Sequence, residues 1–291
     1  MRFDNEFIAE EVNKIKGTYV PVKSSMPRVL FVKETRILNL HPNPDDEFSI
    51  PGIGPNYEII SNYEREFRET RKHDYKYLDD PLIVEKIYPS GYMILNGHHR
   101  WAAAIRMGEK RIPIKIVNLP QEQDVEKMIR ESKHDVRVVM DLDEVVYTSS
   151  KDEPAEPRLP FPSSRVFHER LRRGIPGLFR FFEKNGYDIW VYSSELYSLD
   201  HVQMLFKKYH VHVDGIVTGT TRKSSKKEAQ ERIRKMMANK YRYTYHLDRN
   251  SIVKTHGKTG EFEEKELDCT AEDWSAKVIE AIKEMNSDVE K

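Results

Sequence analysis

The sequence contains a single cysteine, Cys269, among its 291 residues. One thiol cannot form an internal disulfide framework or a thiolate metal cluster, and such a composition is typical of a reducing compartment. The sequence also lacks any run approaching the roughly 20 apolar residues that cross a bilayer, and its first residues lack the apolar segment of a signal peptide. These absences predict a cytoplasmic protein that neither spans a membrane nor is exported.

An excess of charge of either sign is also missing, because Lys plus Arg and Asp plus Glu both number 48. No overall basic field therefore exists to attract a polyanion, and nucleic-acid binding would need a local patch. The candidate patch is the segment RKSSKK at 222–227, together with Tyr241, Tyr243 and Tyr245 on the strand that follows. A solvated helix and core packing explain these residues at least as well. The charge balance thus allows a nucleic-acid partner without favouring one.

The length of the chain predicts two domains, and the charged segment 120–134 is the expected linker between them. We therefore expect a smaller α+β domain over residues 1–134 and a second domain over 135–291. In the first, the Pro- and Gly-rich segment 42–55 reads as an irregular loop. Short apolar runs and one Ala-rich stretch then predict strands at 81–86, 92–95 and 112–117 and a helix at 98–108.

The second domain alternates apolar strands with helices. This alternation predicts an α/β fold with a parallel sheet covered on both faces, whose ligands gather at the carboxyl ends of the strands. The strands are expected at 136–140, 187–192, 211–217 and 241–247, and the helices at 166–185, 199–209 and 226–238.

Two carboxylates, Asp141 and Asp143, follow the first of these strands in the segment VVMDLDEVV. Residues i and i+2 of an extended strand point to one side, so the two carboxylates should converge. Converging like charges are costly unless a cation or a shared proton relieves them, and Mg²⁺ is the usual cation for oxygen ligands. The alternative is a plain strand end at which Asp143 caps a turn.

Three further groups stand beside neighbouring elements. Ser193 ends the strand IWVYSS, where its hydroxyl could donate to a phosphate oxygen or simply cap a helix. Asp248 ends the strand at 241–247, where its carboxylate could complete a metal shell. Lysines open the helix in KSSKKEA, a place that the helix dipole disfavours, so an anionic partner would account for them. A solvated, Lys-rich helix face is the alternative.

These parts, in this order, resemble the haloacid dehalogenase (HAD) superfamily of phosphohydrolases. The matching segments are DLDEV from Asp141, IWVYSS at Ser193, KSSKKEA, and TYHLD ending at Asp248. The resemblance spans residues 136–285 and implies a Rossmann-like parallel sheet. It also implies that no large cap domain is present, because only about 50 residues separate successive motifs. Arg249 stands where many members carry another acid, which implies a leaner metal site.

The resemblance also implies roles for these residues. Asp141 would be the nucleophile that forms an aspartyl-phosphate, Asp143 the acid and base, and Ser193 a phosphate ligand. Mg²⁺ would be bound by Asp141, Asp143 and Asp248. A lysine would neutralise the phosphate, and position at the helix start favours Lys226, then Lys223, with Lys227 as the remaining alternative.

In the first domain, the segment NGHHRW places a Gly turn and three basic or potentially basic residues at a helix start. N–H groups at a helix start bind anions, and Arg100 can grip a phosphate through two nitrogens. The competing interpretation makes His98 and His99 turn residues that bond the backbone, and Arg100 a surface charge. Two adjacent histidines do not have the spacing of a zinc site.

The stretch at 81–117 is similar to the core of the ParB and sulfiredoxin-like superfamily. The similarity implies binding of a nucleotide phosphate, from ATP, ADP or another nucleotide, by the helix start. Some relatives transfer phosphate from ATP or ADP, whereas others hydrolyse CTP or have been described as nucleases. The sulfiredoxin cysteine is missing, which argues against peroxiredoxin repair, and Glu47 is a candidate acid or base. The implied nucleotide-binding residues are Gly97, His98, His99 and Arg100.

Three functions follow from these patterns. The leading one is a Mg²⁺-dependent phosphatase acting on a phosphorylated small molecule, a nucleotide or a nucleic-acid end, with a first domain that binds nucleotide. The second is a bifunctional enzyme whose first domain is an ATP- or ADP-dependent kinase. The third is a non-catalytic module that senses nucleotides. The sequence favours no particular oligomeric state.

Overall fold

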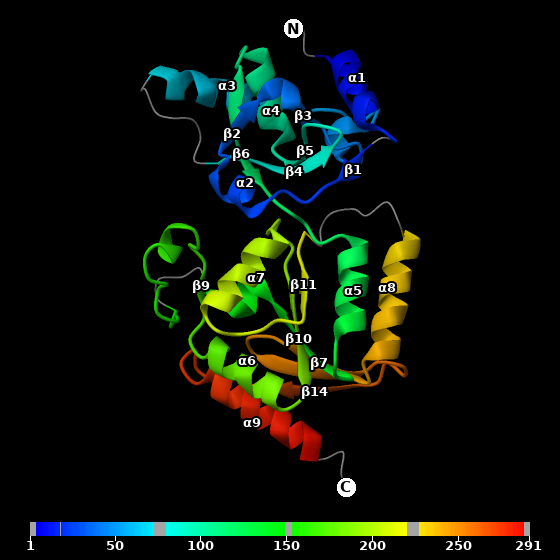
Figure 1. Cartoon of the computed structure of the whole chain (residues 1–291), viewed down its shortest axis with the longest axis vertical. Coiled ribbons are helices and arrows are strands. Elements are labelled where there is room, and N and C mark those ends of the chain that lie inside the picture. Colours follow the sequence, from blue (N-terminus) through cyan, green and yellow to red (C-terminus); the bar gives the residue numbers. More distant parts are fainter. Residues whose placement is uncertain (1–3, 18, 73–79, 149–152, 220–226, 288–291) are drawn as a thin grey trace. The chain divides into compact units, whose positions relative to one another are not determined.

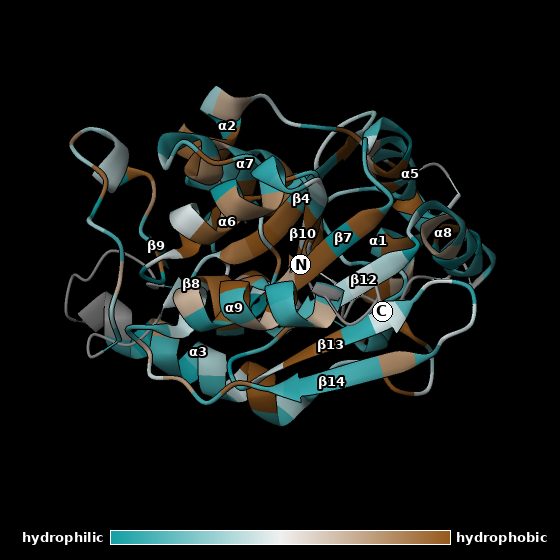
Figure 2. Cartoon of the chain, turned by 90° about the horizontal axis from the view of Figure 1, so that it is seen from below, coloured by the Kyte–Doolittle hydropathy of each residue, from teal (hydrophilic) through white to brown (hydrophobic). Residues whose placement is uncertain are grey.

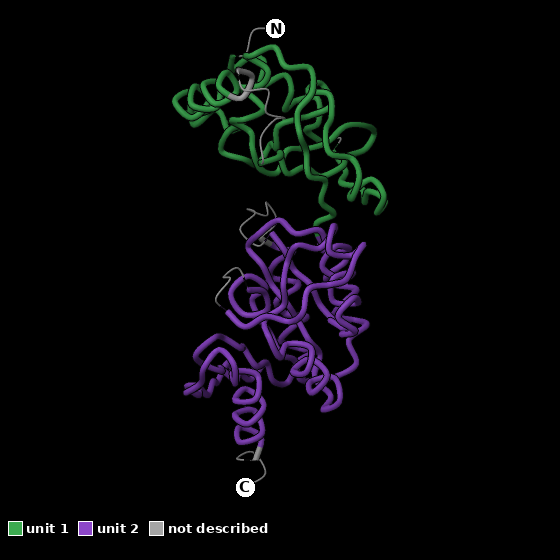
Figure 3. The backbone as a smooth tube through the Cα atoms, turned by 90° about the vertical axis from the view of Figure 1, so that its left-hand side faces the viewer, with its two compact units in different colours: residues 1–119 green, residues 120–291 purple. Residues whose placement is uncertain are grey.

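The computed structural model describes residues 4–17, 19–72, 80–148, 153–219 and 227–287. The chain forms two compact units, residues 1–119 and 120–291 (Figure 3). The expected division lay at 134/135, after the charged segment. Instead, helix α5 (Glu122–Glu131) is amphipathic and buries Val125 and Ile129 in the second unit, so this segment packs with that unit rather than linking the two.

The first unit is built on a mixed sheet with the strand order β2-β6-β4-β5-β3, and β1 pairs with β4. Strands β4 and β5 form an antiparallel hairpin, whereas β4 and β6 run parallel. The strands expected at 81–86, 92–95 and 112–117 are confirmed as β4, β5 and β6. The strand bounds are β1 (Val20–Pro21), β2 (Glu34–Arg36), β3 (Leu40–His41), β4 (Leu82–Tyr88), β5 (Tyr92–Asn96) and β6 (Arg111–Ile116).

Helices of the first unit pack on this sheet through apolar side chains. The predicted Ala-rich helix is α4, which buries Trp101 and three consecutive alanines against Val84, Ile94 and Ile114. Small alanines let the helix lie close to its neighbours, while Trp101 fills the space beside them. The helix bounds are α1 (Asn5–Ile15), α2 (Met26–Phe31), α3 (Tyr57–Lys72) and α4 (His98–Arg106), with short turns η1 (Ile37–Asn39) and η2 (Glu47–Ser49).

The second unit contains a six-stranded sheet with the order β11-β10-β7-β12-β13-β14. The first four strands are parallel, and β13 and β14 are antiparallel additions that the expected all-parallel sheet did not include. The α/β class is therefore confirmed, with a mixed sheet. The strand bounds are β7 (Val136–Asp141), β10 (Tyr187–Tyr192), β11 (Gly215–Val217), β12 (Tyr243–Leu247), β13 (Ser251–His256) and β14 (Phe262–Glu266).

Helices lie on both faces of this sheet (Figure 1). Helices α5 and α8 (Lys227–Lys240) pack on the face that carries Trp190 and Val139. Helices α6 (Ile175–Lys184), α7 (Leu199–Lys208) and α9 (Trp274–Ser287) pack on the face that carries Val138 and Met140. Alternate residues of β7 thus enter opposite cores, as expected for a strand buried on both sides. Figure 2 shows the hydrophobic central strands and the hydrophilic edge strand β14.

The segment between β7 and α6 differs from the expected helix at 166–185, which begins only at Ile175. Before it, β8 (Tyr147–Thr148) pairs with β9 (Arg170–Leu171), and η4 (Ser163–Arg165) forms a short turn. The pairing of Arg170 and Leu171 with β8 keeps this part extended, and Gly174, with φ at +90°, caps the helix only after it. Within the described ranges, no helix has the combination of length and apolar character that a membrane span requires.

Candidate functional site

Asp141 is the last residue of β7 and also the cap of the turn that follows. Its Oδ1 accepts hydrogen bonds from the backbone N–H groups of Asp143, at 2.7 Å, and Glu144, at 2.9 Å. The next five residues form a single helical turn, η3 (Leu142–Val146). The strand alternation that should have brought Asp141 and Asp143 to one side therefore stops at Asp141. The turn-capping alternative is confirmed, but the capping residue is Asp141 and not Asp143.

The Asp143 carboxylate is held by two hydroxyl groups. Ser193 Oγ donates to Oδ2 at 2.5 Å, and the Tyr197 hydroxyl donates to Oδ1 at 2.8 Å. Ser193 is only 1% exposed, and its Oγ also accepts the N–H of Glu195 at 2.9 Å. A serine hydroxyl can donate only one hydrogen bond. In this arrangement Ser193 donates it to Asp143, so it cannot also donate to a phosphate. The expected role of Ser193 as a phosphate donor thus requires this bond to be released.

Tyr197 is a site residue that the sequence did not indicate. Burial raises the pKa of Tyr197 well above its usual range, and the hydrogen bond to Asp143 raises it further. The hydroxyl therefore stays protonated at neutral pH and remains a donor. Tyr147 packs edge-on against Tyr197, with ring centroids 5.9 Å apart, and its own pKa is raised by burial. Its hydroxyl is buried without a hydrogen-bond partner in the described part of the chain.

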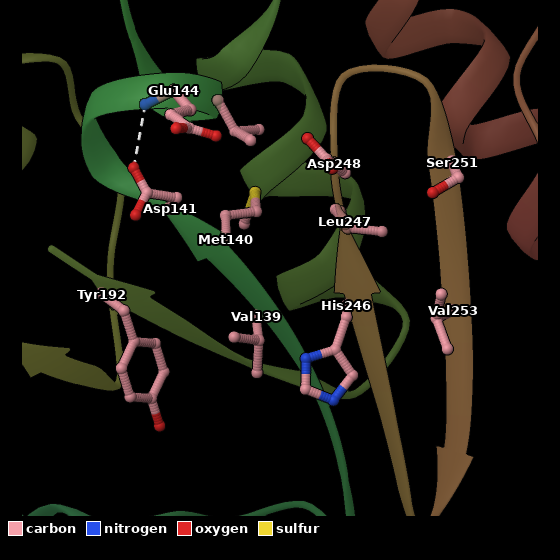
Figure 4. A pocket seen from close by; sticks show the side chains of 11 residues that line it. Val139, Met140, Asp141, Glu144, Tyr192, His246, Leu247, Asp248, Ser251 and Val253 are labelled. Carbon is pink, nitrogen blue, oxygen red and sulfur yellow. Dashed lines mark hydrogen bonds between the residues drawn. The ribbon is translucent and has the colours of Figure 1, made fainter. Parts of the chain in front are cut away.

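Asp141 and Asp248 line one cavity of about 360 Å³, together with Glu144 and Ser251 (Figure 4). Strands β7 and β12 are neighbouring and parallel, with Met140 opposite Leu247, so each aspartate comes directly after a paired position. This confirms that the carboxyl ends of two parallel strands bring these residues to one place.

The carboxylate oxygens in this cavity are of the kind that a hard divalent cation prefers. Asp248 Oδ1 accepts the N–H of Arg249 at 2.6 Å, which leaves Oδ2 of both Asp141 and Asp248 outside the hydrogen bonds of the described residues. Mg²⁺ commonly uses one or two carboxylates and completes its octahedral shell with water and substrate phosphate. Among the residues that the structure describes, no three His, Cys, Asp or Glu side chains are arranged to hold a metal. The expected shell of three carboxylates is therefore not formed, because Asp143 faces Ser193 and Tyr197.

Arg249 stabilises the turn η3, which contains Asp143 and Glu144. Its Nε donates to the carbonyl of Glu144 at 2.6 Å, and its Nη1 pairs with Glu153 at 3.0 Å. Arg172 donates to the same carbonyl at 3.0 Å. A hydrogen bond from Thr148 and the two arginines lower the pKa of Glu153. Arg249, where the HAD resemblance implies an acid, thus connects the turn η3 to Glu153 in the segment that follows it.

The lysines predicted at the start of α8 are placed only in part. Lys223 and Lys226 lie outside the described residues, and Lys227 is the first residue of the helix. Their assignment to the phosphate therefore stays a prediction.

The second candidate site is the start of α4 in the first unit. Gly97 caps this helix with φ at +101°, and a Cβ there would lie 2.3 Å from the side chain of Leu82, so glycine is required. His98 Nε2 accepts the N–H of Asn43 at 3.1 Å, and His99 Nε2 accepts the N–H of Asn56 at 3.0 Å. The interpretation that both histidines bond the backbone is confirmed, so these two nitrogens are occupied.

Burial decides the charge of these histidines. His98 is 4% exposed, and its burial lowers its pKa to about 4, against a smaller opposing effect of Asp46. Burial also lowers the pKa of His99. Both rings are therefore neutral at pH 7, and each carries its proton on Nδ1 because Nε2 accepts a hydrogen bond.

Arg100 is not the surface charge of the competing interpretation, since it is 4% exposed. Its Nη1 pairs with the Asp80 carboxylate at 2.9 Å and donates to the Asp80 carbonyl. Its guanidinium also lies over the Tyr63 ring, 5.7 Å from the centroid. Its Nε is buried without a partner in the ranges that the structure describes. The Nε donor is thus available to a ligand, while Asp80 offsets part of the positive charge.

Comparison with known proteins gives information on the N-terminal part of the chain, up to and including α5. A model of the ParB N-terminal domain family matches residues 66–133, which include the start of α4. Solved structures of the C-terminally truncated chromosome-partitioning protein ParB from Caulobacter crescentus also match. The complex with CTP-gamma-S has 24% identity and a TM-score of 0.24, over 35% of this chain and 55% of that one. The complex with the centromeric parS site has 24% identity and a TM-score of 0.23, over 35% and 50%.

The match therefore spans about half the length of these ParB chains. No curated protein matches the sequence. The expected ParB-like character of the N-terminal part is confirmed by the family match, while the resemblance of the C-terminal part to HAD phosphohydrolases stays a prediction.

Proposed function

We propose that the second unit is a Mg²⁺-dependent phosphatase that acts through an aspartyl-phosphate on Asp141. The observation that carries this proposal is the shared cavity of Asp141 and Asp248 at the ends of two neighbouring parallel strands. The separate support of the Asp143 carboxylate by Ser193 and Tyr197 adds to it. Two acids with different surroundings suit two roles, one as nucleophile and one as proton carrier.

The two N–H groups on Asp141 Oδ1 fix the carboxylate and leave Oδ2 to attack phosphorus. A P–O bond to Oδ2 forms while the ester P–O bond breaks, and protonated Asp143 gives its proton to the leaving alkoxide. Ionised Asp143 then takes a proton from water, which attacks the aspartyl-phosphate and releases inorganic phosphate.

Asp141 and Asp248 would hold the Mg²⁺ ion, which when bound supplies charge neutralisation for the phosphoryl oxygens. A lysine at the start of α8 would add positive charge on the same side.

We further propose that the first unit binds a nucleotide phosphate at the start of α4. The N–H groups of His98 and His99, the neutral imidazoles and the remaining Nε donor of Arg100 support this. The family match over 66–133 supports a ParB-like nucleotide site, and the matched ParB solved with CTP-gamma-S makes CTP the first nucleotide to test.

The phosphatase proposal is tested by phosphate release from an aryl phosphate in the presence and absence of Mg²⁺. We expect Asp141→Asn to lower kcat by about 10³-fold or more, because an amide is a poor nucleophile toward phosphorus. Asp268→Asn makes the same chemical change at an exposed residue outside the cavity and should leave the rate unchanged. Equal activity of the wild type and Asp141→Asn would reject the assigned nucleophile, and activity that survives chelation would reject the role of Mg²⁺.

A further inference from the structure

The cavity that contains Asp141 and Asp248 continues along the sheet, away from the strand ends. Its lining forms two rows across β10, β7, β12 and β13 (Figure 4). The row at the carboxyl edge is polar and consists of Asp141, Asp248 and Ser251. The second row consists of Val139, His246 and Val253, each two residues from Asp141, Asp248 or Ser251 on the same strand. Tyr192 of β10 lies beside this row.

Strand register fixes this second row. Val139 pairs with His246, and His246 pairs with Val253, so the three side chains are cross-strand neighbours on one face. Residues two apart on a strand share a face, so each member of the row lies directly behind a polar residue of the edge. Tyr192 is opposite Asp141 in the pairing of β10 with β7, and its ring extends back beside Val139 (Figure 4). Its hydroxyl lies 3.4 Å from Arg137 Nη1, which fixes the ring.

The second row contains no acidic, lysine or arginine side chain. Val139 and Val253 are apolar and only partly buried, as is Tyr192, and His246 places an exposed imidazole ring between the two valines. A row of two valines, one phenol and one imidazole offers a flat surface for a ring.

The size of the cavity also exceeds what phosphate needs. A volume of about 360 Å³ corresponds to roughly a dozen waters at about 30 Å³ each, whereas a phosphate group has five heavy atoms. The volume falls in the range of about 300 to 1,000 Å³ that is usual for sites of small organic ligands. The space beyond the edge row is therefore suited to a second part of the same substrate.

We propose that Val139, Tyr192, His246 and Val253 bind a flat aromatic group on the alcohol side of the substrate, so that the natural substrate is a phosphomonoester carrying an aromatic ring, such as a nucleoside monophosphate. The proposal rests on the phosphatase function and specifies its substrate class. Stacking of a base on an aromatic side chain contributes about 1–3 kcal/mol, which corresponds to a preference of roughly 5- to 150-fold over a substrate without the ring.

The test compares adenosine 5′-monophosphate with ribose 5-phosphate, because both carry the same primary phosphate ester and differ in the aromatic base. We expect kcat/KM to be about tenfold or more higher for adenosine 5′-monophosphate. Val253→Trp fills the row, so it should bring the ratio close to one. Thr255→Trp is the matched control, since Thr255 lies two residues further along the same face of β13 and outside the cavity; it should preserve the ratio.

Equal kcat/KM for the two substrates, or a ratio that survives Val253→Trp, would overturn the proposed aromatic subsite while leaving the phosphatase proposal intact. If the wild type hydrolyses neither these two substrates nor the aryl phosphate, the phosphatase proposal fails, and calorimetric binding of the same two compounds decides the subsite separately. Tighter binding of adenosine 5′-monophosphate that is lost in Val253→Trp and kept in Thr255→Trp would support it. Equal affinities would reject it.

Discussion

The buried, neutral His98 makes the stability of the first unit depend on pH in a defined direction. In the folded unit its pKa is lowered to about 4 by burial, whereas in an unfolded chain histidine titrates near 6.5. Between these two values the unfolded state binds more protons than the folded state. The free energy of unfolding therefore falls as the pH drops from 6.5 to 4, and the contribution of His98 is fully present above 6.5.

The size of this effect follows from the difference between the two pKa values. Each unit corresponds to 1.36 kcal/mol, so complete protonation of the unfolded chain would remove about 3 kcal/mol of stability. Because typical domains are stable by only about 5–15 kcal/mol, this is a large fraction. The protonated ring would also lose Nε2 as the acceptor for the Asn43 amide. His99, whose pKa is also lowered by burial, acts in the same direction.

The assay is urea unfolding at pH 7 and pH 4.5 of the wild type and of His98→Gln. Glutamine keeps an acceptor for the Asn43 amide but does not titrate, so its variant removes the pH dependence of this site. Trp101 fluorescence reports on the first unit in a background where Trp190 and Trp274 are replaced by Phe. We expect the wild type to lose about 2–3 kcal/mol more than the variant between the two pH values. Equal losses would refute the burial argument.

Two other predictions concern the candidate sites. Tyr197→Phe removes one of the two hydroxyl groups that hold the Asp143 carboxylate, so this carboxylate is less well positioned and kcat for the aryl phosphate should fall by about 10- to 100-fold. The control Tyr209→Phe should leave kcat unchanged, and an unchanged kcat in Tyr197→Phe would contradict the assigned contact. Arg100→Lys keeps the charge but loses the planar fork, so calorimetric affinity for CTP or ATP should fall about tenfold. The exposed Arg111→Lys should bind as the wild type does, and unchanged affinity in Arg100→Lys would remove Arg100 from the site.

The backbone around Asp141 was predictable because strands buried on both faces have a strong sequence signal. Apolar runs alternating with helices indicate a parallel sheet, and parallel strands bring their carboxyl ends together, so Asp141 and Asp248 could be placed near each other before the structure was known. The antiparallel strand β14 was not predicted, because its sequence FEEKE is exposed and carries no apolar alternation.

The side-chain contacts of the site were less predictable. The expectation for Asp143 assumed that strand geometry continues, whereas the Asp141 side chain itself ends the strand by capping the next turn. Tyr197 and Arg249 act through partners distant in sequence, so no local pattern indicates their roles. In the first unit, the residue types at 97–100 identified a helix start correctly, but burial decides that the histidines accept hydrogen bonds and that Arg100 pairs with Asp80.

The two adjacent histidines of α4 have one more consequence. His98 holds Asn43 and His99 holds Asn56, so the Pro- and Gly-rich segment between these asparagines is closed at its base by a single turn of helix. Asn43 and Asn56, the two ends of this segment, are each held by α4, so the distance between them does not depend on the length of the segment. Insertions near Gly52 and Gly54 would therefore enlarge a surface ring at a small entropic cost without displacing the helix start. The length of this loop can therefore vary without a change in the geometry of the start of α4.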